Sequence, residues 1–460
     1  MVRRCWSVPA PGRAPTGQAE DPSPPSDRYP DRMSATDTAA PVRLPDLASP
    51  PADIAQALVD VPSVSGSEGP LADAVEAALR DLDHLEVLRH GNTVVARTHL
   101  GRPQRVVVAG HLDTVPVSLR SRNVPGRREE RDGQEVVWGR GSVDMKGGVA
   151  VALHLAATLT HPGKDVTWVL YDNEEVAAHL NGLGRVLATH PDWLAGDLAV
   201  LGEPTASRIE GGCNGTLRLV LDVRGVTAHS ARAWRGVNAV HAAAPLIQRV
   251  ATAPVHEVEV EGLVFRESFS VVGIQGGTAA NSVPDACRLT VNYRFAPDLT
   301  ALEALERALL VLAGHDPGPR PGRLPGGRPT APAAQALPGR TGTMPGTVEV
   351  SSPAARAVLD AAPPLVVGAA PVEVALDDLC EGARPGLSCP SARELVGLVR
   401  DRGGTVGPKY GWTDVARFSA IGVPALNLGP GDPMLCHTDD EHCPVHQIQD
   451  VAEILRSWLS

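Results

Sequence analysis

Short apolar runs alternate with helical patterns along the first half of the chain. Runs at 105–109, 165–170 and 197–201 are typical of buried strands, and the apolar stretch 147–160 predicts a helix. A further amphipathic stripe, which begins near Ser67, predicts another helix. Strands that alternate with helices indicate βαβ units, so we expect an α/β domain with parallel strands.

The hydrophobic period changes in the second half. Alternating segments predict strands at 216–223, 268–272, 288–294 and 372–376, and helical periodicity predicts helices at 237–250 and 299–312. This β-α-β-β-α-β order is typical of a ferredoxin-like α+β unit. We therefore expect a discontinuous α/β domain, 51–213 and 379–460, interrupted by an inserted domain at 214–378.

Two Pro-rich segments show no such period. Residues 1–50 are predicted to be a disordered extension, and Met33 is an alternative start of the native protein. Residues 315–347 are rich in Pro and Gly and are predicted to be a mobile insertion within the inserted domain, with an extension toward residue 370 as an alternative.

Acidic and imidazole side chains follow the strands of the first half. Four of them recur about every 30 residues, the length of one βαβ unit: His111, Asp144, Glu175 and Glu203. Because the carboxyl ends of parallel strands lie along one edge of a sheet, these side chains are expected to converge. Zinc binds imidazole nitrogen and carboxylate oxygen, so the pattern predicts a metal site. A single His or Glu without this spacing would more often be a surface residue.

Neighbouring carboxylates indicate how such a site would work. Asp113 lies two residues after His111, where its carboxylate can accept the second imidazole N–H. Glu174 stands beside Glu175, so one glutamate can bind metal while the other transfers protons. A bridging carboxylate would hold two ions ~3.5–4 Å apart, as in two-metal hydrolases.

The segments around these residues read GHLDTVP (110–116), WGRGSVDMKGG (138–148), YDNEE (171–175) and LGEPT (201–205). They resemble the signature segments of the M20 family of dizinc metallopeptidases and deacylases. Further segments resemble the succinyl-diaminopimelate desuccinylase branch of that family: 210–216, 228–232, 276–287, 292–298, 411–418 and 427–432. The resemblance runs from about Ile54 to Leu459, broken by the insertion, and is more specific for the family than for the substrate.

The resemblance implies a zinc-hydrolase-like mixed-sheet catalytic domain, with the inserted domain acting as a lid and dimerisation domain. It also implies two Zn²⁺ ions, for which Co²⁺ can substitute. The implied ligands are the bridging Asp144, His111 with Glu203 on one ion, and Glu175 with His437 on the other.

Further roles follow from the same resemblance. Glu174 would be the general base, and Asp113 would support the metal ligands from behind. His229 would reach the site of a partner subunit and stabilise the oxyanion. The implied substrate-binding residues are Asn281, Arg294 and Thr413.

Some of these residues have plainer interpretations. His437 lies near Cys436, His442, Cys443 and His446, which could form a separate structural zinc site, although the cysteine spacing fits none of the usual short patterns. Without the resemblance, His229 would be an ordinary turn histidine and Arg294 a solvated strand residue.

Composition limits the functional class. A chain of 460 residues with 43% hydrophobic content can form roughly two to three domains. The formal net charge of −11 argues against nucleic acid and against an anionic membrane surface as partners. Seven cysteines without regular spacing favour reduced thiols in the cytoplasm. No apolar run approaches the ~18 residues of a membrane span.

The function that the resemblance implies is hydrolysis of N-succinyl-LL-2,6-diaminopimelate to succinate and LL-2,6-diaminopimelate by a homodimer. Other enzymes of the same class are alternatives: acetylornithine deacetylase, aminoacylase or dipeptidase. A different class of protein, a non-catalytic relative that binds zinc, is also an alternative. The presence of Glu174 with all five candidate ligands favours catalysis, because a non-catalytic relative is expected to lose its proton-transferring carboxylate.

Overall fold

The computed structural model describes residues 42–318, 320, 344–368 and 370–460, and the structural statements below concern these residues. The predicted extension lies outside the described residues up to position 41, and the predicted insertion lies outside them at 319 and 321–343.

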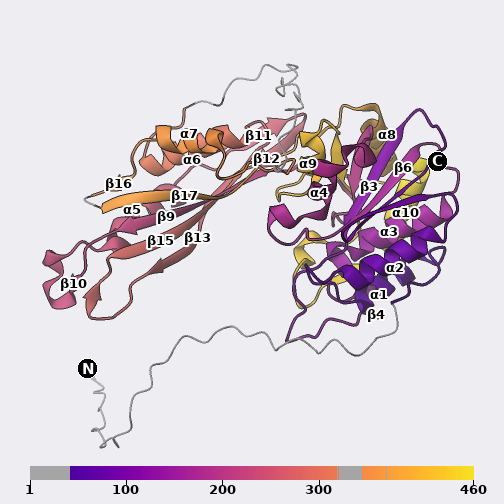
Figure 1. Ribbon diagram of the computed structural model, residues 1–460, viewed down its shortest axis with the longest axis horizontal. Helices are drawn as coiled ribbons and strands as arrows, with labels where there is room; N and C mark the ends of the chain where they lie inside the picture. The colour runs from indigo at the N-terminus through magenta and orange to yellow at the C-terminus, as the bar shows by residue number, and fades with distance from the viewer. Residues whose placement is uncertain (1–41, 319, 321–343, 369) are drawn as a thin grey trace, which may run out of the picture. The chain divides into compact units, whose positions relative to one another are not determined.

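A mixed sheet forms the centre of the α/β part (Figure 1), with the strand order β1-β2-β6-β3-β7-β19-β8-β18. Strand β3 is parallel to β6 and β7, as the sequence predicts, and β19 continues this parallel group beside β7. The strands are β1 Glu86–His90, β2 Thr93–Arg97, β3 Arg105–His111, β6 Asp165–Tyr171, β7 Leu198–Leu201, β8 Ile209–Gly211, β18 Val406–Pro408 and β19 Ala425–Asn427.

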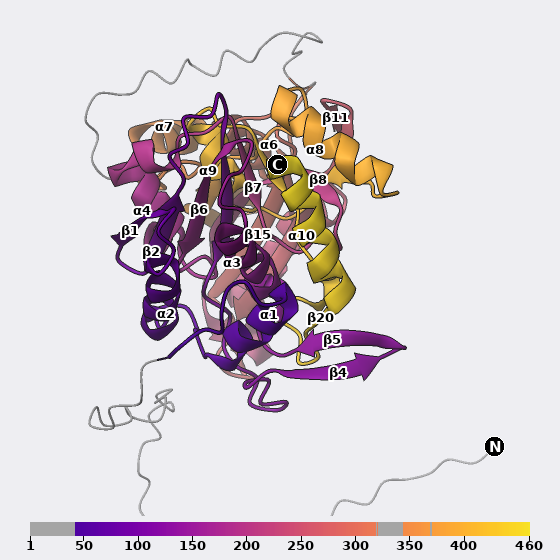
Figure 2. The ribbon, with the colours of Figure 1, turned by 90° about the vertical axis from the view of Figure 1, so that its right-hand side faces the viewer.

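Helices cover both faces of this sheet because its central strands are apolar on both sides. Val106 and Val108 face a core shared with α1, α2, α3, α8 and α10, whereas Val107 and Ala109 face a core shared with α4 and α9. Figure 2 shows α1, α3 and α10 together on one side. The helices are α1 Pro51–Asp60, α2 Gly69–Arg80, α3 Gly147–Thr158, α4 Gly182–Thr189, α8 Pro390–Asp401, α9 Val415–Ala420 and α10 Val445–Leu459.

A second, antiparallel sheet has the order β13-β15-β9-β17-β16. Alternate residues of β9, such as Leu217 and Leu219, form a core with α5 and α6, while Arg218, Val220 and Asp222 lie on the opposite face. The main elements are β9 Gly215–Arg224, α5 Ala239–Ala251, β13 Ser268–Gly276, β15 Ala286–Phe295, α6 Ala301–Ala313 and β17 Ala370–Cys380. They follow the predicted β-α-β-β-α-β order, and the expected fold class is confirmed.

Three smaller groups of strands complete the described chain. They are the ribbon of β4 Arg127–Arg131, β5 Gln134–Trp138 and β20 His442–Pro444, the hairpin of β11 Glu257–Val260 and β12 Leu263–Arg266, and the short pair of β10 Ala228–His229 and β14 Ser282–Val283. The sequence patterns did not predict these groups. In the described residues, none of the helices is long and apolar enough to cross a membrane.

The stretch between the predicted insertion and β17 is structured, and how far the insertion extends toward residue 370 stays a prediction. Helix α7, Pro353–Ala361, and strand β16, Val366–Val367, occupy this stretch. The Ser352 hydroxyl caps α7 by accepting the N–H of Ala355, whose side chain is buried against the core that contains α6. The predicted domain bounds stay a prediction, because residues 42–460 form one compact unit.

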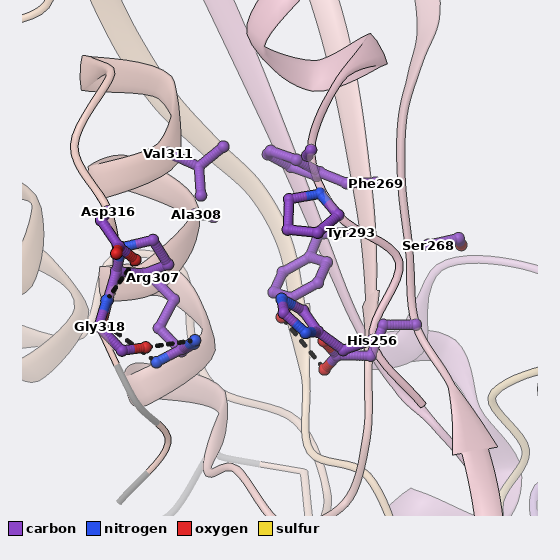
Figure 3. Close-up of a pocket in the computed structure, with 13 residues that line it drawn as sticks. His256, Ser268, Phe269, Tyr293, Arg307, Ala308, Val311, Asp316 and Gly318 are labelled. Carbon is purple, nitrogen blue, oxygen red and sulfur yellow. Dashed lines mark hydrogen bonds between the residues drawn. The ribbon is translucent and has the colours of Figure 1, made fainter. Parts of the chain in front are cut away.

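A small cavity of about 120 Å³ lies between α6 and the strands of the antiparallel sheet (Figure 3). Ala308 and Val311 of α6 face Phe269 and Tyr293 across it. None of the predicted metal ligands is among the described residues that line this cavity.

Candidate metal centre

The predicted ligands lie at the carboxyl ends of three adjacent parallel strands. His111 is the last residue of β3, Glu175 follows β6, and Glu203 follows β7. Asp144 lies in the irregular turn before α3, and His437 lies in the loop before β20. The strand edge therefore collects side chains that are far apart in the sequence.

Two of the three groups of possible ligands share one carboxylate, and the third joins His111, Glu174 and Glu175. In the first group the ligand atoms of His111, Asp144 and Glu203 lie within 4.8 Å of one another. In the second group the ligand atoms of Asp144, Glu175 and His437 do the same. The two oxygens of Asp144 face different histidines: Oδ1 is 3.1 Å from Nε2 of His111, and Oδ2 is 3.4 Å from Nε2 of His437.

This donor set fits a pair of divalent cations. Each group combines one imidazole nitrogen with two carboxylates, which are ligands that Zn²⁺ accepts, and Asp144 is placed to bridge. The metal-capable groups among the described residues do not include Cys436, His442, Cys443 or His446. The geometry therefore favours the predicted site over a separate structural zinc site.

The charges of this cluster are strongly coupled. Burial opposes ionisation of Asp144, yet its hydrogen bonds with His111 and His437 hold its pKa far below the usual range. Burial and the charge of Asp144 raise the pKa of Glu203 to about 8. Hydrogen bonds with Asp144 and Glu175 raise the pKa of His437 to about 10. The raised pKa values of His111 and His437 favour protonated imidazoles beside these carboxylates, and bound cations would displace these protons.

Asp113 supports the site differently from the prediction. The second imidazole nitrogen of His111, Nδ1, lies 2.9 Å from the backbone carbonyl of Asp113 and 3.6 Å from its carboxylate. The carboxylate instead accepts the backbone N–H groups of Glu174 and Glu175, at 2.9 and 3.0 Å. The predicted hydrogen bond from the imidazole to this carboxylate was wrong, because the extended backbone brings the carbonyl closer to the ring.

Two residues that the sequence patterns missed hold the ligand loops in place. The buried Glu441 accepts the N–H groups of Val143 and Asp144, both at 3.1 Å, and its second oxygen lies 2.8 Å from Arg140 Nη1. The fully buried Glu68 accepts the N–H of Asn173 just before the glutamate pair. The only sequence signal was the place of Glu441 four residues after His437.

The backbone of His437 has an unusual conformation. Its φ of 63° lies in the left-handed region, which a residue other than glycine adopts at some cost. Its carbonyl is 3.4 Å from Arg140, the same arginine that binds Glu441. The loop that carries this histidine is thus tied to the loop that carries Asp144.

Glu174, which directly precedes the candidate ligand Glu175, lines a cavity of about 540 Å³. Burial raises its pKa well above the usual range, although the charge of His111 opposes the shift. Arg294 lines the same cavity. Thr413 is buried, and its hydroxyl donates to Asn427 over 3.2 Å.

His229 and Asn281 lie together but apart from this cavity. Ser230, next to His229, donates its N–H to the carbonyl of Asn281 over 2.9 Å. Both lie beyond the far end of β9, whose ten residues span roughly 30 Å at about 3.3 Å per residue. Figure 1 shows β10 at the end of the antiparallel sheet away from β11 and β12. Within its own chain, His229 contacts none of the candidate ligands.

Residues 107–460 match the peptidase family M20/M25/M40. A succinyl-diaminopimelate desuccinylase from Corynebacterium glutamicum is 42% identical over 90% of this chain and 97% of its own. A Mycobacterium tuberculosis protein that is provisionally named succinyl-diaminopimelate desuccinylase DapE is 43% identical over 90% of this chain and 99% of its own. The aminopeptidase PepT from Bacillus cereus shares the fold, with a TM-score of 0.64 and 16% identity over 90% of this chain and 98% of its own. The chain therefore belongs to the M20/M25/M40 peptidase family.

Proposed function

We propose that this chain hydrolyses the amide bond of N-succinyl-LL-2,6-diaminopimelate and releases succinate and LL-2,6-diaminopimelate. The observation that carries the proposal is the pair of ligand groups that share Asp144, directly beside Glu174. The two relatives at 42% and 43% identity, both named for this activity, support the choice of substrate.

The proposed cofactors are two Zn²⁺ ions, which Co²⁺ can replace. His111 and Glu203 would hold one ion, Glu175 and His437 the other, and Asp144 would bridge them. Zinc in such a site lowers the pKa of water toward ~7 and polarises a carbonyl group.

Glu174 is the proposed general base. Its carboxylate takes a proton from the attacking water and later gives it to the leaving amine. Burial suits this role because it raises the proton affinity of the group. Asp113 fixes the backbone of Glu174 through the hydrogen bond to its N–H and so keeps the base beside the metal ligands.

The proposed active form is a homodimer. Because the length of β9 separates His229 and Asn281 from the metal ligands of their own chain, we assign them to the site of a second subunit. In this arrangement the imidazole of His229 donates to the oxyanion that forms as water attacks. Arg294 and Thr413 would contact the substrate from the chain that supplies the metal ligands.

The proposed compartment is the cytoplasm. Every cysteine in the described part of the chain is a free thiol, which agrees with a reducing environment.

A product-release assay tests the proposed function. The purified, zinc-loaded chain is expected to release succinate from N-succinyl-LL-2,6-diaminopimelate much faster than acetate from N-acetylornithine. Equal or reversed rates would overturn the proposed substrate, and no hydrolysis of any N-acyl amino acid would favour the non-catalytic alternative.

A further inference from the structure

The cavity beside Glu174 has a charged wall that metal binding does not use. Arg218 of β9 and the adjacent residues Asp377 and Asp378 of β17 line it. Arg218 forms an ion pair with Asp377, and its guanidinium lies 3.8 Å from Asp378. These three residues are called the charged triplet below.

A β-bulge creates this arrangement. In a regular strand the side chains of two consecutive residues point to opposite faces. The register of β17 against β9 shifts between Leu376 and Asp378, so that Asp377 is the extra residue. As a result, both aspartates lie close to Arg218 and both line the same cavity. An undistorted strand would direct one of them into the apolar core.

The charges of the wall suit a zwitterion. The triplet combines one positive and two negative charges, so it attracts an ammonium group while Arg218 can still receive a carboxylate. A carboxylate alone, such as the free end of a succinyl group, would meet a net negative surface. A bare carboxylate is better received by Arg294, which lines the same cavity and interacts electrostatically with Asp378 but makes no hydrogen bond or ion pair with the residues that the structure describes.

We propose that the charged triplet binds the free α-amino-acid head of the substrate, with its ammonium on Asp377 and Asp378 and its carboxylate on Arg218. The inference rests on the proposed function and names the part of the chain that selects diaminopimelate from other N-acyl amino acids. An N-succinyl derivative that lacks the distal ammonium or carboxylate would leave part of the triplet without its partner.

The triplet has a simpler structural interpretation as a surface ion pair. The side chains of Arg218 and Asp377 are 43% and 48% exposed, and such pairs contribute little to stability. Loss of a purely structural pair would change kcat/KM equally for all substrates. The two interpretations therefore differ in whether the effect of a substitution on kcat/KM depends on the substrate.

The test measures kcat/KM for three substrates with the zinc-loaded full chain, or the inhibition constant where turnover is too slow. The substrates are N-succinyl-LL-2,6-diaminopimelate, N-succinyl-L-2-aminopimelate without the distal ammonium, and N-succinyl-L-lysine without the distal carboxylate. The variants are Asp378→Asn and Arg218→Gln. Asp222→Asn is the matched control, because Asp222 pairs with Arg288 on the same sheet but outside the cavity.

Asp378→Asn is expected to lower kcat/KM for the diaminopimelate substrate about tenfold, mainly through KM, as for the loss of one hydrogen bond to a charged group. Its effect on the aminopimelate substrate should stay below twofold. Arg218→Gln should lower kcat/KM for the diaminopimelate substrate and leave that for the lysine substrate nearly unchanged. Asp222→Asn should leave kcat/KM unchanged for all three substrates.

Equal effects of each variant on all substrates, or no effect on any, would overturn the inference while the parent's succinate release still upholds the proposed function. No succinate release by the parent chain would overturn both.

Discussion

Replacing Glu441 with Gln tests whether the buried network behind the candidate metal ligands positions them. Glutamine keeps the shape of the side chain and an oxygen that can accept the N–H groups of Val143 and Asp144. Its neutral amide cannot pair with Arg140, so the substitution removes the ion pair and leaves the remaining packing in place.

The magnitude follows from burial. The side chains of Glu441 and Arg140 are 1% and 5% exposed, and a lost partner in such a buried pair costs ~3–5 kcal/mol. Arg140 keeps contacts of 3.2 and 3.3 Å to the carbonyls of Pro116 and Thr438, which favours the lower end, about 3 kcal/mol. Because the network fixes the backbone at Asp144, zinc affinity should fall ~10–100-fold.

Urea unfolding of the metal-free variant and zinc competition against a chromogenic chelator measure the two effects. The control is Glu135→Gln, which removes the exposed pair with Arg128 and should cost less than ~1 kcal/mol. If Glu441→Gln unfolds with the same free energy as the control and binds zinc like the parent, the network does not position the ligands.

Other predictions follow from the same geometry. His111→Ala and His437→Ala should each lower zinc content by about one ion without unfolding the chain, since each serves a different ion; two full ions in the second variant would place the ligand elsewhere. Glu174→Gln should keep both ions and lower kcat ~10²–10⁴-fold, so a rate within a few-fold of the parent rejects the general base. His229→Ala should lower kcat with little change in KM, and mixing it with Glu174→Gln should restore activity through mixed dimers. Subunit exchange shown by mass spectrometry without regained activity would exclude a role across the dimer. In the metal-free chain the pKa of Glu203 is raised from 4.5 to about 8 and that of His437 from 6.5 to about 10. Proton binding by Glu203 and His437 therefore stabilises the folded metal-free chain at low pH. This stabilisation is lost as pH rises through the two raised pKa values. Thermal unfolding of the chelated protein across this range should show a falling midpoint, and a flat profile would contradict the charge balance.

The central strands and the convergence of His111, Glu175 and Glu203 at their ends could be predicted from the sequence because both follow local rules. Apolar runs mark β3, β6 and β7, and the parallel arrangement brings their carboxyl ends together. The antiparallel sheet was predictable from alternation, since Leu217 and Leu219 face a core while the residues between them do not.

The supporting network could not be predicted because its contacts join distant segments. Arg140 and Glu441 are 301 residues apart, and neither carries a periodic signal. Whether Nδ1 of His111 pairs with the carbonyl or the carboxylate of Asp113 depends on the local path of the backbone. The charged triplet depends on a bulge in β17, which shifts the register by one residue and leaves no mark in the hydrophobic pattern.

We propose that this chain is a dinuclear, metal-dependent desuccinylase. The most direct test strips the protein with a chelator, adds Zn²⁺ in steps, and follows succinate release from N-succinyl-LL-2,6-diaminopimelate. We expect no release without metal and a rate that reaches its plateau at two ions per chain. Full activity in the stripped protein, or no succinate release by the chain with two ions bound, would contradict the account.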